Sequence, residues 1–306
     1  MKTNYIKYFL ALLLFGSNGI VASQIHLTSY EIVFWRTMIG SILLLALLFL
    51  GKQKLTFYHN RKDLFFIGLS GIAMGTSWIF LYEAYAEIGV SLASLAYYCG
   101  PVIVMVLSPF VFKEKLTAEK IVAFLIVLVG IFFVNGTEAA ESMNQIGLMC
   151  GFLAAVMYSL MVMFNKQAKR ITGLENSAIQ LFVSFLTVAV YVGFKTGYAL
   201  SVKTEDLPWI FALGLLNTGI GGYFYFSSIG SLPVQTVAIC GYLEPLSAVI
   251  LSVLLLNETL SATQVFGAAL IIGGALFGEL RGGGNQNERQ IYSVSRLQKQ
   301  NKSQNP

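Results

Sequence analysis

Charged residues are scarce in this chain. Asp, Glu, Lys and Arg make up 11% of its 306 residues, whereas 56% are hydrophobic. A water-soluble domain is usually about a quarter charged, so this sequence has too little polar surface to cover itself in water. Apolar segments of about 20 residues, long enough to cross a bilayer as a helix, recur along the chain. The composition therefore excludes a soluble domain and predicts a polytopic membrane protein whose surroundings are the lipid bilayer.

Cysteine and histidine are also rare, with three and two residues. Cys99, Cys150 and Cys240 lie within predicted helices without C-x-x-C spacing, as expected of small packing residues. His26 and His59 lie in predicted loops, and there is no H-E-x-x-H motif and no Walker A loop. The sequence thus predicts no metal, no cofactor, no ATP hydrolysis by the chain itself and no enzyme. An intramembrane enzyme remains the alternative from another functional class.

The apolar segments favour helices as the fold class. Lipid offers no hydrogen bonds to the backbone, so only helices and closed barrels span membranes, and these segments exceed the ~10 alternating residues of a barrel strand. We predict an all-α polytopic membrane protein with ten transmembrane helices. Their approximate ranges are 8–24, 30–51, 64–86, 91–112, 118–135, 146–165, 176–194, 208–229, 234–256 and 263–280.

Both ends of the chain need separate interpretation. Residues 281–306 are polar and rich in Gly, Asn and Gln, which predicts a disordered cytoplasmic tail. The first 24 residues resemble a cleaved signal in the order of their features, which are basic residues, then an apolar run, then small residues (MKTNYIKYFLALLLFGSNGIVASQ). The internal repeat described below gives this segment a partner and favours its retention, although the sequence leaves its cleavage open.

The distribution of Lys and Arg predicts the topology. With the N-terminus inside, 17 of the 20 basic residues fall in inner segments, two (Lys195 and Lys203) in outer loops, and Arg36 within a helix. Cytoplasmic loops carry such an excess, so both termini should be cytoplasmic. The same residues explain the net charge of +5 as anchoring to anionic lipid, and no nucleic-acid partner is required.

The chain contains an internal repeat. A shift of 144 positions aligns YYCGPVIVMVLSPFVFKEKLTAEK with GYLEPLSAVILSVLLLNETLSATQ without a gap. Nine of the 37 positions from 98 to 134 are identical, where average residue usage would give roughly three. We therefore predict a first five-helix unit over residues 1–140 and a second over 141–280.

The odd number of helices in each unit makes the two units inverted in the membrane. Inverted repeats supply two conformations of similar energy, related by exchange of the halves, which is the structural basis of alternating access in secondary transporters. The plainer alternative is a duplication that only enlarges the bundle.

The repeated motifs resemble a known family. Each half ends in a proline-bearing helix, a short E-x-L turn (FKEKLT, LNETLS) and a Gly-rich helix (LIVLVGIFFV, GAALIIGGALFGE). This pattern resembles the EamA family of the drug/metabolite transporter superfamily over about residues 5–280. The resemblance implies an inner-membrane carrier, most often an exporter of amino acids, other metabolites or toxic compounds.

The stretch GYLEPLSA places a carboxylate, Glu244, near the middle of the helix predicted at 234–256. A charge at the bilayer centre costs at least ~2.5 kcal/mol on insertion scales, so the side chain must face a polar cavity or hold a proton. We expect Glu244 to line the pathway, where it either pairs with a cationic group of the substrate or carries the coupling proton. A neutral glutamic acid bonded to a neighbouring helix is the alternative.

Prolines mark possible hinges in both halves. Pro101 and Pro245 occupy equivalent repeat positions, beside Gly100 and Gly241. A proline inside a helix removes a backbone donor and displaces the carbonyl four residues earlier, and interrupted helices are where transporters place substrate sites. These four residues are predicted to form helix hinges, with a kink for packing alone as an equal alternative.

Arg36 and Glu83 are a second pair of charges within predicted helices. Both should lie about one turn below the outer surface, so we predict an ion pair that closes the outer end or anchors a charged substrate. Snorkelling of Arg36 to the surface is at least as good an explanation.

Aromatic and amide side chains complete the predicted pathway. Trp78, Tyr82 and Tyr85 share one helix face, and Tyr85 suits the interfacial belt as well. Rings can stack on the apolar part of an organic solute while amides orient its polar part, although packing also explains such stripes. The predicted pathway residues are Asn18, Trp78, Tyr82, Tyr97, Asn217, Tyr223, Tyr242 and Glu244.

Together these features predict a secondary transporter, and the family resemblance implies that it is an exporter of small organic metabolites such as amino acids or amphipathic toxic compounds. Its partners would be the small-molecule substrate, the bilayer and, as one option, protons. A passive channel is the closest alternative, which the inverted repeat and the central prolines disfavour.

Overall fold

The computed structural model describes residues 2–51, 55–135, 144–198, 200, 202–256 and 261–278. Over these ranges the chain forms helices joined by short connections, with no strand. The predicted tail, residues 281–306, lies outside the described residues, as does the turn at 257–260 that contains Glu258.

The first half of the chain folds into six α-helices and a short turn. They are α1 (Lys2–Gly16), α2 (Asn18–Ala22), α3 (Ser29–Leu50), η1 (Phe57–His59), α4 (Arg61–Tyr97), α5 (Cys99–Phe112) and α6 (Ala118–Asn135). The break between α1 and α2 at Ser17 falls inside the span predicted at 8–24, so this span is interrupted rather than continuous.

The second half follows the same order. It comprises α7 (Gln145–Gln167), α8 (Gly173–Thr196), η2 (Thr204–Asp206), α9 (Leu207–Ala212), η3 (Leu213–Ile220), α10 (Gly221–Ile229), α11 (Val234–Gly241), α12 (Leu243–Leu256) and a last helix, Ala262–Gly278. The segment η3 is a π-helical turn within the span predicted at 208–229. Such wider turns are frequent at functional sites.

The long helix α4 doubles back on itself. A Cβ atom built on Gly151 of α7 would lie 2.8 Å from the Cβ of Ala96 and 3.9 Å from the Cβ of Ala84. Twelve residues of straight helix would separate these two alanines by about 18 Å. The hydroxyl groups of Tyr85 and Ser94 also lie 3.4 Å apart. The chain therefore reverses within α4 between these residues, where the sequence predicts the connection between the spans 64–86 and 91–112.

The helices of the two halves are interrupted at equivalent residues of the repeat. Tyr98 separates α4 from α5 with φ −68° and ψ −3°, and Tyr242 separates α11 from α12 with φ −71° and ψ −5°. The predicted single helix over 234–256 is thus wrong, because the chain starts a new helix at Leu243. Pro101 and Pro245 consequently occupy first turns, where backbone N–H groups have no helical partner, and neither proline removes a hydrogen bond.

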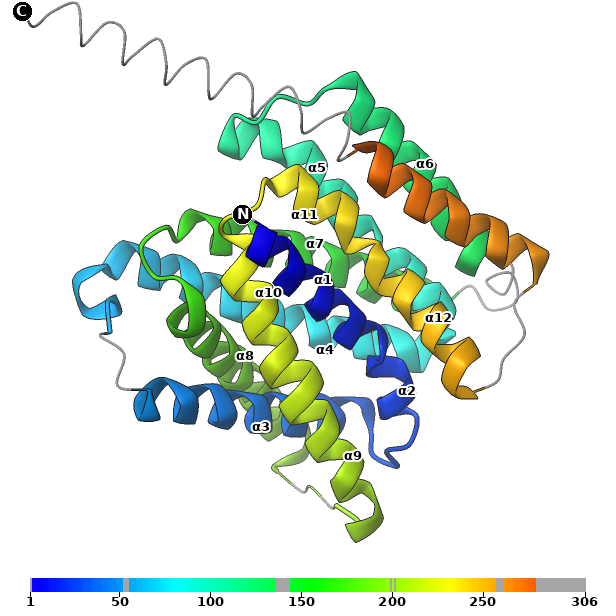
Figure 1. Cartoon of the computed structure of the whole chain (residues 1–306). Coiled ribbons are helices and arrows are strands. Elements are labelled where there is room, and N and C mark those ends of the chain that lie inside the picture. The colour runs from blue at the N-terminus through cyan, green and yellow to red at the C-terminus, as the bar shows by residue number, and fades with distance from the viewer. Residues whose placement is uncertain are drawn as a thin grey trace, which may run out of the picture.

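The helix contacts have two-fold symmetry. The pairs α1·α10 and α4·α7 are equivalent under the repeat, as are α3·η3 and α4·α8, and α1·α12 and α5·α7. The contact α3·α8 pairs equivalent helices directly, and so does the packing of α6 beside the helix Ala262–Gly278 at one edge of the bundle (Figure 1). Each half thus packs mainly on the other half, and the two share one core.

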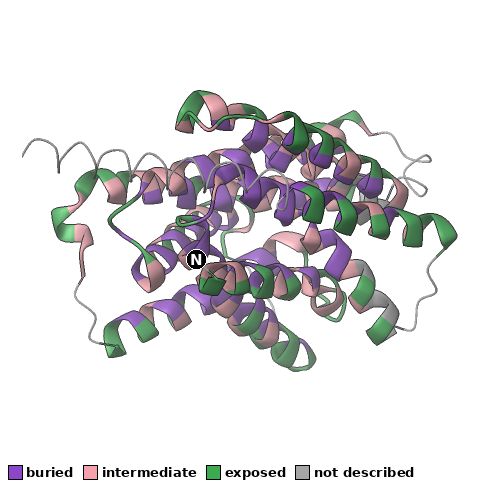
Figure 2. Ribbon diagram, turned by 45° about the horizontal axis from the view of Figure 1, so that its top comes forward, coloured by how far each residue is buried: buried purple, intermediate pink, exposed green. Residues whose placement is uncertain are grey.

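The exterior of the bundle is apolar. Large hydrophobic residues such as Phe110, Phe194 and Leu50 are exposed, and Figure 2 shows that the buried segments of the ribbon lie towards the interior of the bundle. Among the described residues, six helical segments are long and apolar enough to cross a membrane, with shorter apolar helices at Cys99–Phe112 and Ala262–Gly278. The chain is an all-α polytopic membrane protein with two inverted repeats, as the sequence predicts.

Two aspartates tie the halves together at opposite ends of the bundle. The Asp63 carboxylate accepts hydrogen bonds from the backbone N–H groups of Lys169 and Arg170, at 2.9 and 2.6 Å. The Asp206 carboxylate accepts one from the backbone N–H of His26, at 3.0 Å, and contacts its imidazole Nδ1 at 3.1 Å. His26 and Arg170 are 144 positions apart in the sequence. These two aspartate contacts are therefore the same contact made once by each half.

We refer to the end that carries Asp63, Lys166 and Lys169 as the basic end, and to the end that carries His26 and Asp206 as the far end. α3 and α7 begin at the far end, and α4 and α8 begin at the basic end.

The variants Asp63→Ala and Asp206→Ala should each lower the melting temperature of the purified protein in detergent, because each leaves backbone donors of the other half without an acceptor. In the double variant the two decreases should add, since the sites lie far apart and share no partner. The control is Glu205→Ala, an acidic neighbour of Asp206 that should leave the melting temperature unchanged. Unchanged melting in either aspartate variant would contradict this assignment.

Candidate functional site

A cavity lies between the two halves near the middle of the bundle. Its lining residues come from α1, α2, α3, α4, α7, α8, η3, α10 and α12, and its space for water-sized molecules is about 70 Å³. About 10–15 Å³ suffices for one water, so the cavity has room for a few water molecules. Its lining includes Asn18, Arg36, Ser77, Trp78, Tyr97, Tyr158, Thr218, Gly222, Tyr225 and Glu244. We refer to it as the central cavity.

Arg36 is the only buried arginine in the described chain, with a side chain held by neutral groups. Its Nε donates to the Thr218 hydroxyl at 2.9 Å, and its terminal nitrogens donate to the Tyr82 hydroxyl at 3.2 Å and the Asn18 carbonyl at 3.4 Å. Its guanidinium carbon lies 4.8 Å from the centre of the Trp78 ring. Among the described residues no carboxylate forms an ion pair with it. The guanidinium of Arg36 on α3 is therefore a positive charge that is held in one orientation and is not neutralised by direct contact with a carboxylate.

Glu244 lines the same cavity from the first turn of α12. Its side chain is half-buried and makes no hydrogen bond or ion pair within the described part of the chain. Acidic groups are stabilised at a helix N-terminus, where unpaired N–H groups carry partial positive charge. The break at Tyr242 therefore creates a helix end that can hold this carboxylate inside the membrane.

Rings form the remaining walls of the central cavity. Tyr97 packs edge-on against Tyr158 with 5.5 Å between ring centres, and the hydroxyl groups of Tyr158 and Tyr225 lie 3.3 Å apart. Trp78 lies under the Arg36 guanidinium. The structure thus brings Asn18, Trp78, Tyr97 and Glu244 of the predicted pathway to one cavity, together with Arg36.

Tyr242, predicted to line the pathway, is fully buried instead. Its hydroxyl donates to the backbone carbonyl of Tyr98 at 2.8 Å, and the two rings pack edge-on at 6.4 Å. Tyr242 thereby connects the helix break of one half to the equivalent break of the other, which is a structural contact rather than a pathway position.

Asn217 and Tyr223 also lie away from the cavity lining. Asn217 is buried and donates to the Leu14 carbonyl at 2.6 Å and the Ser17 hydroxyl at 2.7 Å, where the chain breaks between α1 and α2. Tyr223 accepts a hydrogen bond from Lys7 at 3.3 Å, and the Lys7 ammonium lies 4.8 Å from the centre of its ring. Both residues join α1 to the second half.

Glu83 does not pair with Arg36. Its carboxylate forms an ion pair with Lys195 and accepts a hydrogen bond from the Tyr191 hydroxyl at 2.6 Å, both on α8. The predicted Arg36–Glu83 ion pair is thus replaced by two separate sets of contacts. Equal depth along a bundle does not place two residues on facing sides of their helices, which is why the prediction erred.

The glycines and prolines at the breaks have different surroundings. Gly100 lies where α5 and α7 approach closely, and its carbonyl accepts a hydrogen bond from the Ser159 hydroxyl at 2.9 Å. A Cβ at Gly100 would lie 2.7 Å from Cδ1 of Tyr158, whereas one at Gly241 would meet its nearest atom, the Tyr8 hydroxyl, at 3.4 Å. Pro101 and Pro245 are both buried. The four predicted hinge residues therefore do flank the two breaks.

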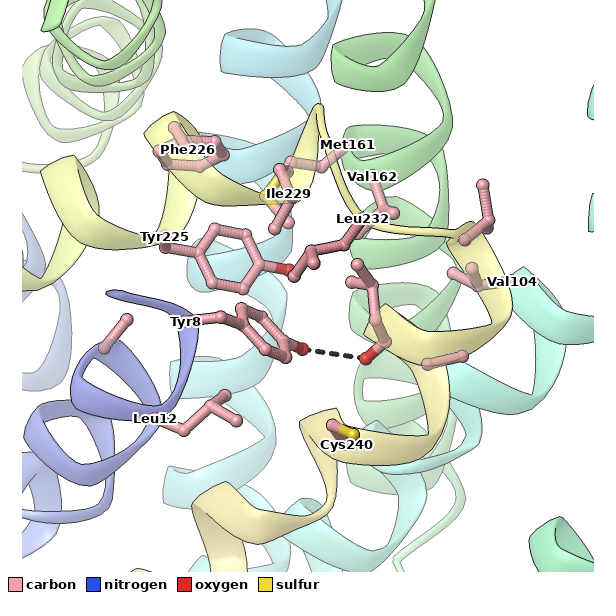
Figure 3. Close-up of a cluster of buried hydrophobic side chains, with 14 of the residues drawn as sticks. Tyr8, Leu12, Val104, Met161, Val162, Tyr225, Phe226, Ile229, Leu232 and Cys240 are labelled. Carbon is pink, nitrogen blue, oxygen red and sulfur yellow. Dashed lines mark hydrogen bonds between the residues drawn. The ribbon is translucent and has the colours of Figure 1, made fainter. Parts of the chain in front are cut away.

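The basic end of the pathway is tightly closed. The Tyr8 hydroxyl donates to the Val237 carbonyl at 2.7 Å, and the Tyr8 ring packs on Tyr225 at 5.6 Å (Figure 3). Lys166 donates to the carbonyl of Ile229, at 2.8 Å, and to that of Leu232. Contacts between α1, α7 and the segment from α10 to α11 thus seal this end.

Sequence reasoning overlooked two residues near the site. Tyr158 lines the cavity from α7, and Lys195 is the partner of Glu83. Tyr158 is an isolated tyrosine in an apolar helix, which carries no signal of its own in the sequence. Lys195 falls at the end of a predicted helix, where a basic residue normally requires no partner.

Comparison with known proteins identifies related sequences. The model of the EamA-like transporter family matches the chain twice, over residues 3–136 and 145–278. An uncharacterized transporter of Bacillus subtilis (strain 168), YxxF, is 24% identical over 289 residues, covering 94% of this chain and 92% of the relative. Another from Helicobacter pylori (strain J99 / ATCC 700824) is 24% identical over 278 residues, covering 83% of this chain and 88% of that protein.

The fold also has a solved counterpart. One crystal structure superposes with a TM-score of 0.78 at 18% sequence identity, covering 92% of this chain and 99% of that one. At this identity the likeness concerns the fold alone.

Gly100→Ala should destabilise the protein, because its added methyl would overlap the Tyr158 ring and approach the Ala155 carbonyl, at 2.7 and 3.2 Å. Overpacking of this kind costs about 1–3 kcal/mol. Gly222→Ala is the matched control, since its added methyl meets no atom within 4 Å. The melting temperatures of both variants in detergent should therefore separate, and equal melting would show that α5 and α7 do not pack this closely.

Proposed function

This chain belongs to the EamA-like transporter family, and from that premise we propose that it exports small organic metabolites, such as amino acids or amphipathic toxic compounds, across the bacterial inner membrane by alternating access. It is an integral membrane transporter rather than an enzyme. The observation that carries the proposal is the central cavity, which holds one fixed cation, one acid and several rings between two inverted halves.

Arg36 supports a substrate with an anionic group. A guanidinium has five N–H groups, and three contacts occupy it here, to Thr218, Tyr82 and Asn18. Its remaining donors are free for a carboxylate or similar group, which a planar guanidinium binds in a bidentate manner. Because Trp78 and the neutral partners fix its orientation, little rotational freedom is lost on binding.

Glu244 supports a role in coupling or in substrate recognition. Its carboxylate has no protein partner among the described residues and lies in the same cavity as Arg36. Such a carboxylate can pair with an ammonium group of the substrate or carry the coupling proton. The rings of Tyr97, Tyr158 and Tyr225 provide apolar walls that suit the rest of an amphipathic solute.

The two inverted halves support the transport mechanism. We assign residues 1–140 and 141–280 to the two units that exchange conformations, with both termini and the basic end in the cytoplasm. The Lys and Arg distribution and the symmetric contacts between the halves support this assignment. The breaks at Tyr98 and Tyr242, with Gly100, Pro101, Gly241 and Pro245 beside them, are where we expect the units to bend.

Glu244→Gln should reduce the rate of transport in proteoliposomes and change its pH dependence, because an amide neither carries a proton nor pairs with an ammonium group. Glu87→Gln, which alters an exposed acid outside the central cavity, is the matched control and should behave like the unmodified protein. If Glu244→Gln transports at the normal rate with an unchanged pH profile, both proposed roles of Glu244 are wrong.

Arg36→Lys should weaken substrate binding by at least about tenfold, because a lysine cannot reproduce the planar contacts to Thr218, Tyr82 and Asn18 while binding an anion. The measurement is counterflow of labelled candidate metabolites, compared with Lys203→Arg as the control for basic exchange at a loop position. Counterflow also separates a carrier, which exchanges solutes, from an open channel, in which they only equilibrate.

A further inference from the structure

A second cavity lies at the far end of the bundle, between α3, α4 and α8. It offers about 410 Å³ to water-sized molecules, against about 70 Å³ in the central cavity. Its lining includes Tyr30, Tyr82, Glu83, Ala86 and Lys195. We refer to it as the vestibule. It is therefore the roomier of the two spaces and lies beside the central one.

One side chain belongs to both environments. The Tyr82 ring lines the vestibule, and its hydroxyl accepts the hydrogen bond from Arg36 at 3.2 Å. Arg36 in turn lines the central cavity. Trp78, one helical turn before Tyr82, packs beneath the guanidinium. The pair of Tyr82 and Arg36 thus stands between the two cavities.

The vestibule carries its own charges. Lys195 pairs with Glu83, and its ammonium lies 4.9 Å from the centre of the Tyr30 ring. Both charged side chains are partly exposed, at 37% and 31% of their surface. A lysine in this position can exchange its partner Glu83 for the carboxylate of a passing solute, since partly exposed ion pairs are weak.

The two ends of the pathway are closed by different means. At the basic end, α1 and α7 bond to backbone carbonyls of Ile229, Leu232 and Val237. Opening that end requires helices to move apart. Between the central cavity and the vestibule stands the side chain of Tyr82, with its hydrogen bond to Arg36.

We propose that the vestibule is an exit site for small organic solutes with an anionic group, and that Tyr82 is the gate through which they reach it from the central cavity. The proposal rests on the proposed transport function. An anionic group that binds the Arg36 donors competes with the Tyr82 hydroxyl for them, so solute binding itself loosens the gate. The group then passes from Arg36 to Lys195, the next cation along the path.

The gate can be tested without knowledge of the substrate. In a protein whose native cysteines, Cys99, Cys150 and Cys240, are replaced by serine or alanine, Gly222→Cys reports on the central cavity, because a side chain there meets no atom within 4 Å. Ala86→Cys reports on the vestibule, where it is exposed. A membrane-impermeant thiol reagent is added to intact cells, and the labelling rates of both positions are measured.

Ala86→Cys should be labelled rapidly in every background. Gly222→Cys should be labelled slowly with Tyr82 intact and at least about tenfold faster with Tyr82→Ala, the factor expected for loss of a hydrogen bond to a charged group. Tyr82→Phe, which keeps the ring but loses the hydroxyl, should give an intermediate rate. Tyr85→Ala is the matched control, because Tyr85 packs on Tyr82 at 5.3 Å but contacts Ser94 rather than Arg36.

Two outcomes would overturn the proposal. If Tyr82→Ala leaves the labelling of Gly222→Cys unchanged, Tyr82 is not the gate. If Ala86→Cys reacts only in inverted vesicles, the vestibule does not open outward and is no exit. Counterflow measured on the same reporter proteins separates these failures from failure of the transport function, because a working carrier whose Gly222→Cys labelling does not rise with Tyr82→Ala refutes the gate alone.

Discussion

A backbone that breaks inside a membrane must find new partners for its polar groups, because lipid supplies none. Here the partners come from the opposite half. Asn217 donates to the Leu14 carbonyl, Ser159 to that of Gly100, and Tyr242 to that of Tyr98, while Tyr8 of the first half donates to Val237 of the second. Neither half could keep its breaks alone. This exchange explains why the repeats share one core instead of forming two separate bundles.

The helix breaks occur at equivalent positions in both halves, whereas the residues of the candidate site are present in one half only. Arg36 has Gln180 at the equivalent position, which is buried and hydrogen-bonded to Asn165. Glu244 has Gly100 there, and Trp78 has Gly222, which leaves open space where the indole stands in the other half. A symmetric frame therefore surrounds an asymmetric cavity. In the mechanism that we propose, the frame would supply two comparable conformations, and the asymmetry the chemistry that distinguishes one solute from another.

The sequence predicted the parts of the structure that depend on composition along the chain. Apolar length identified all spans, and the repeat identified Tyr98 and Tyr242 as equivalent. It did not reveal which way a side chain points around its helix. Tyr242 and Asn217 are therefore buried contacts although both lie at pathway depth, and Glu83 faces Lys195 on α8 instead of Arg36. Pro101 and Pro245 were predicted to bend a continuous helix, whereas in the structure one helix ends and another begins just before each proline. The hydrogen-bond partners available across the bundle decide between these two outcomes.

The closure of the two ends differs in energy as well as in position. Separating α1 from α10 and α11 exposes buried apolar surface, including Tyr8 and Tyr225, at about 25 cal/mol for each Å² uncovered, and it leaves carbonyl groups unpaired. Turning Tyr82 breaks its hydrogen bond to Arg36 and shifts one ring packed beside Tyr85, and Arg36 keeps its contacts to Thr218 and Asn18. The conformation observed here is thus firmly shut at the basic end and lightly shut towards the vestibule. In the transport that we propose, an anionic solute that takes over the Arg36 donors would act on the weaker closure first, so the residue that binds the solute would also set the direction in which it leaves.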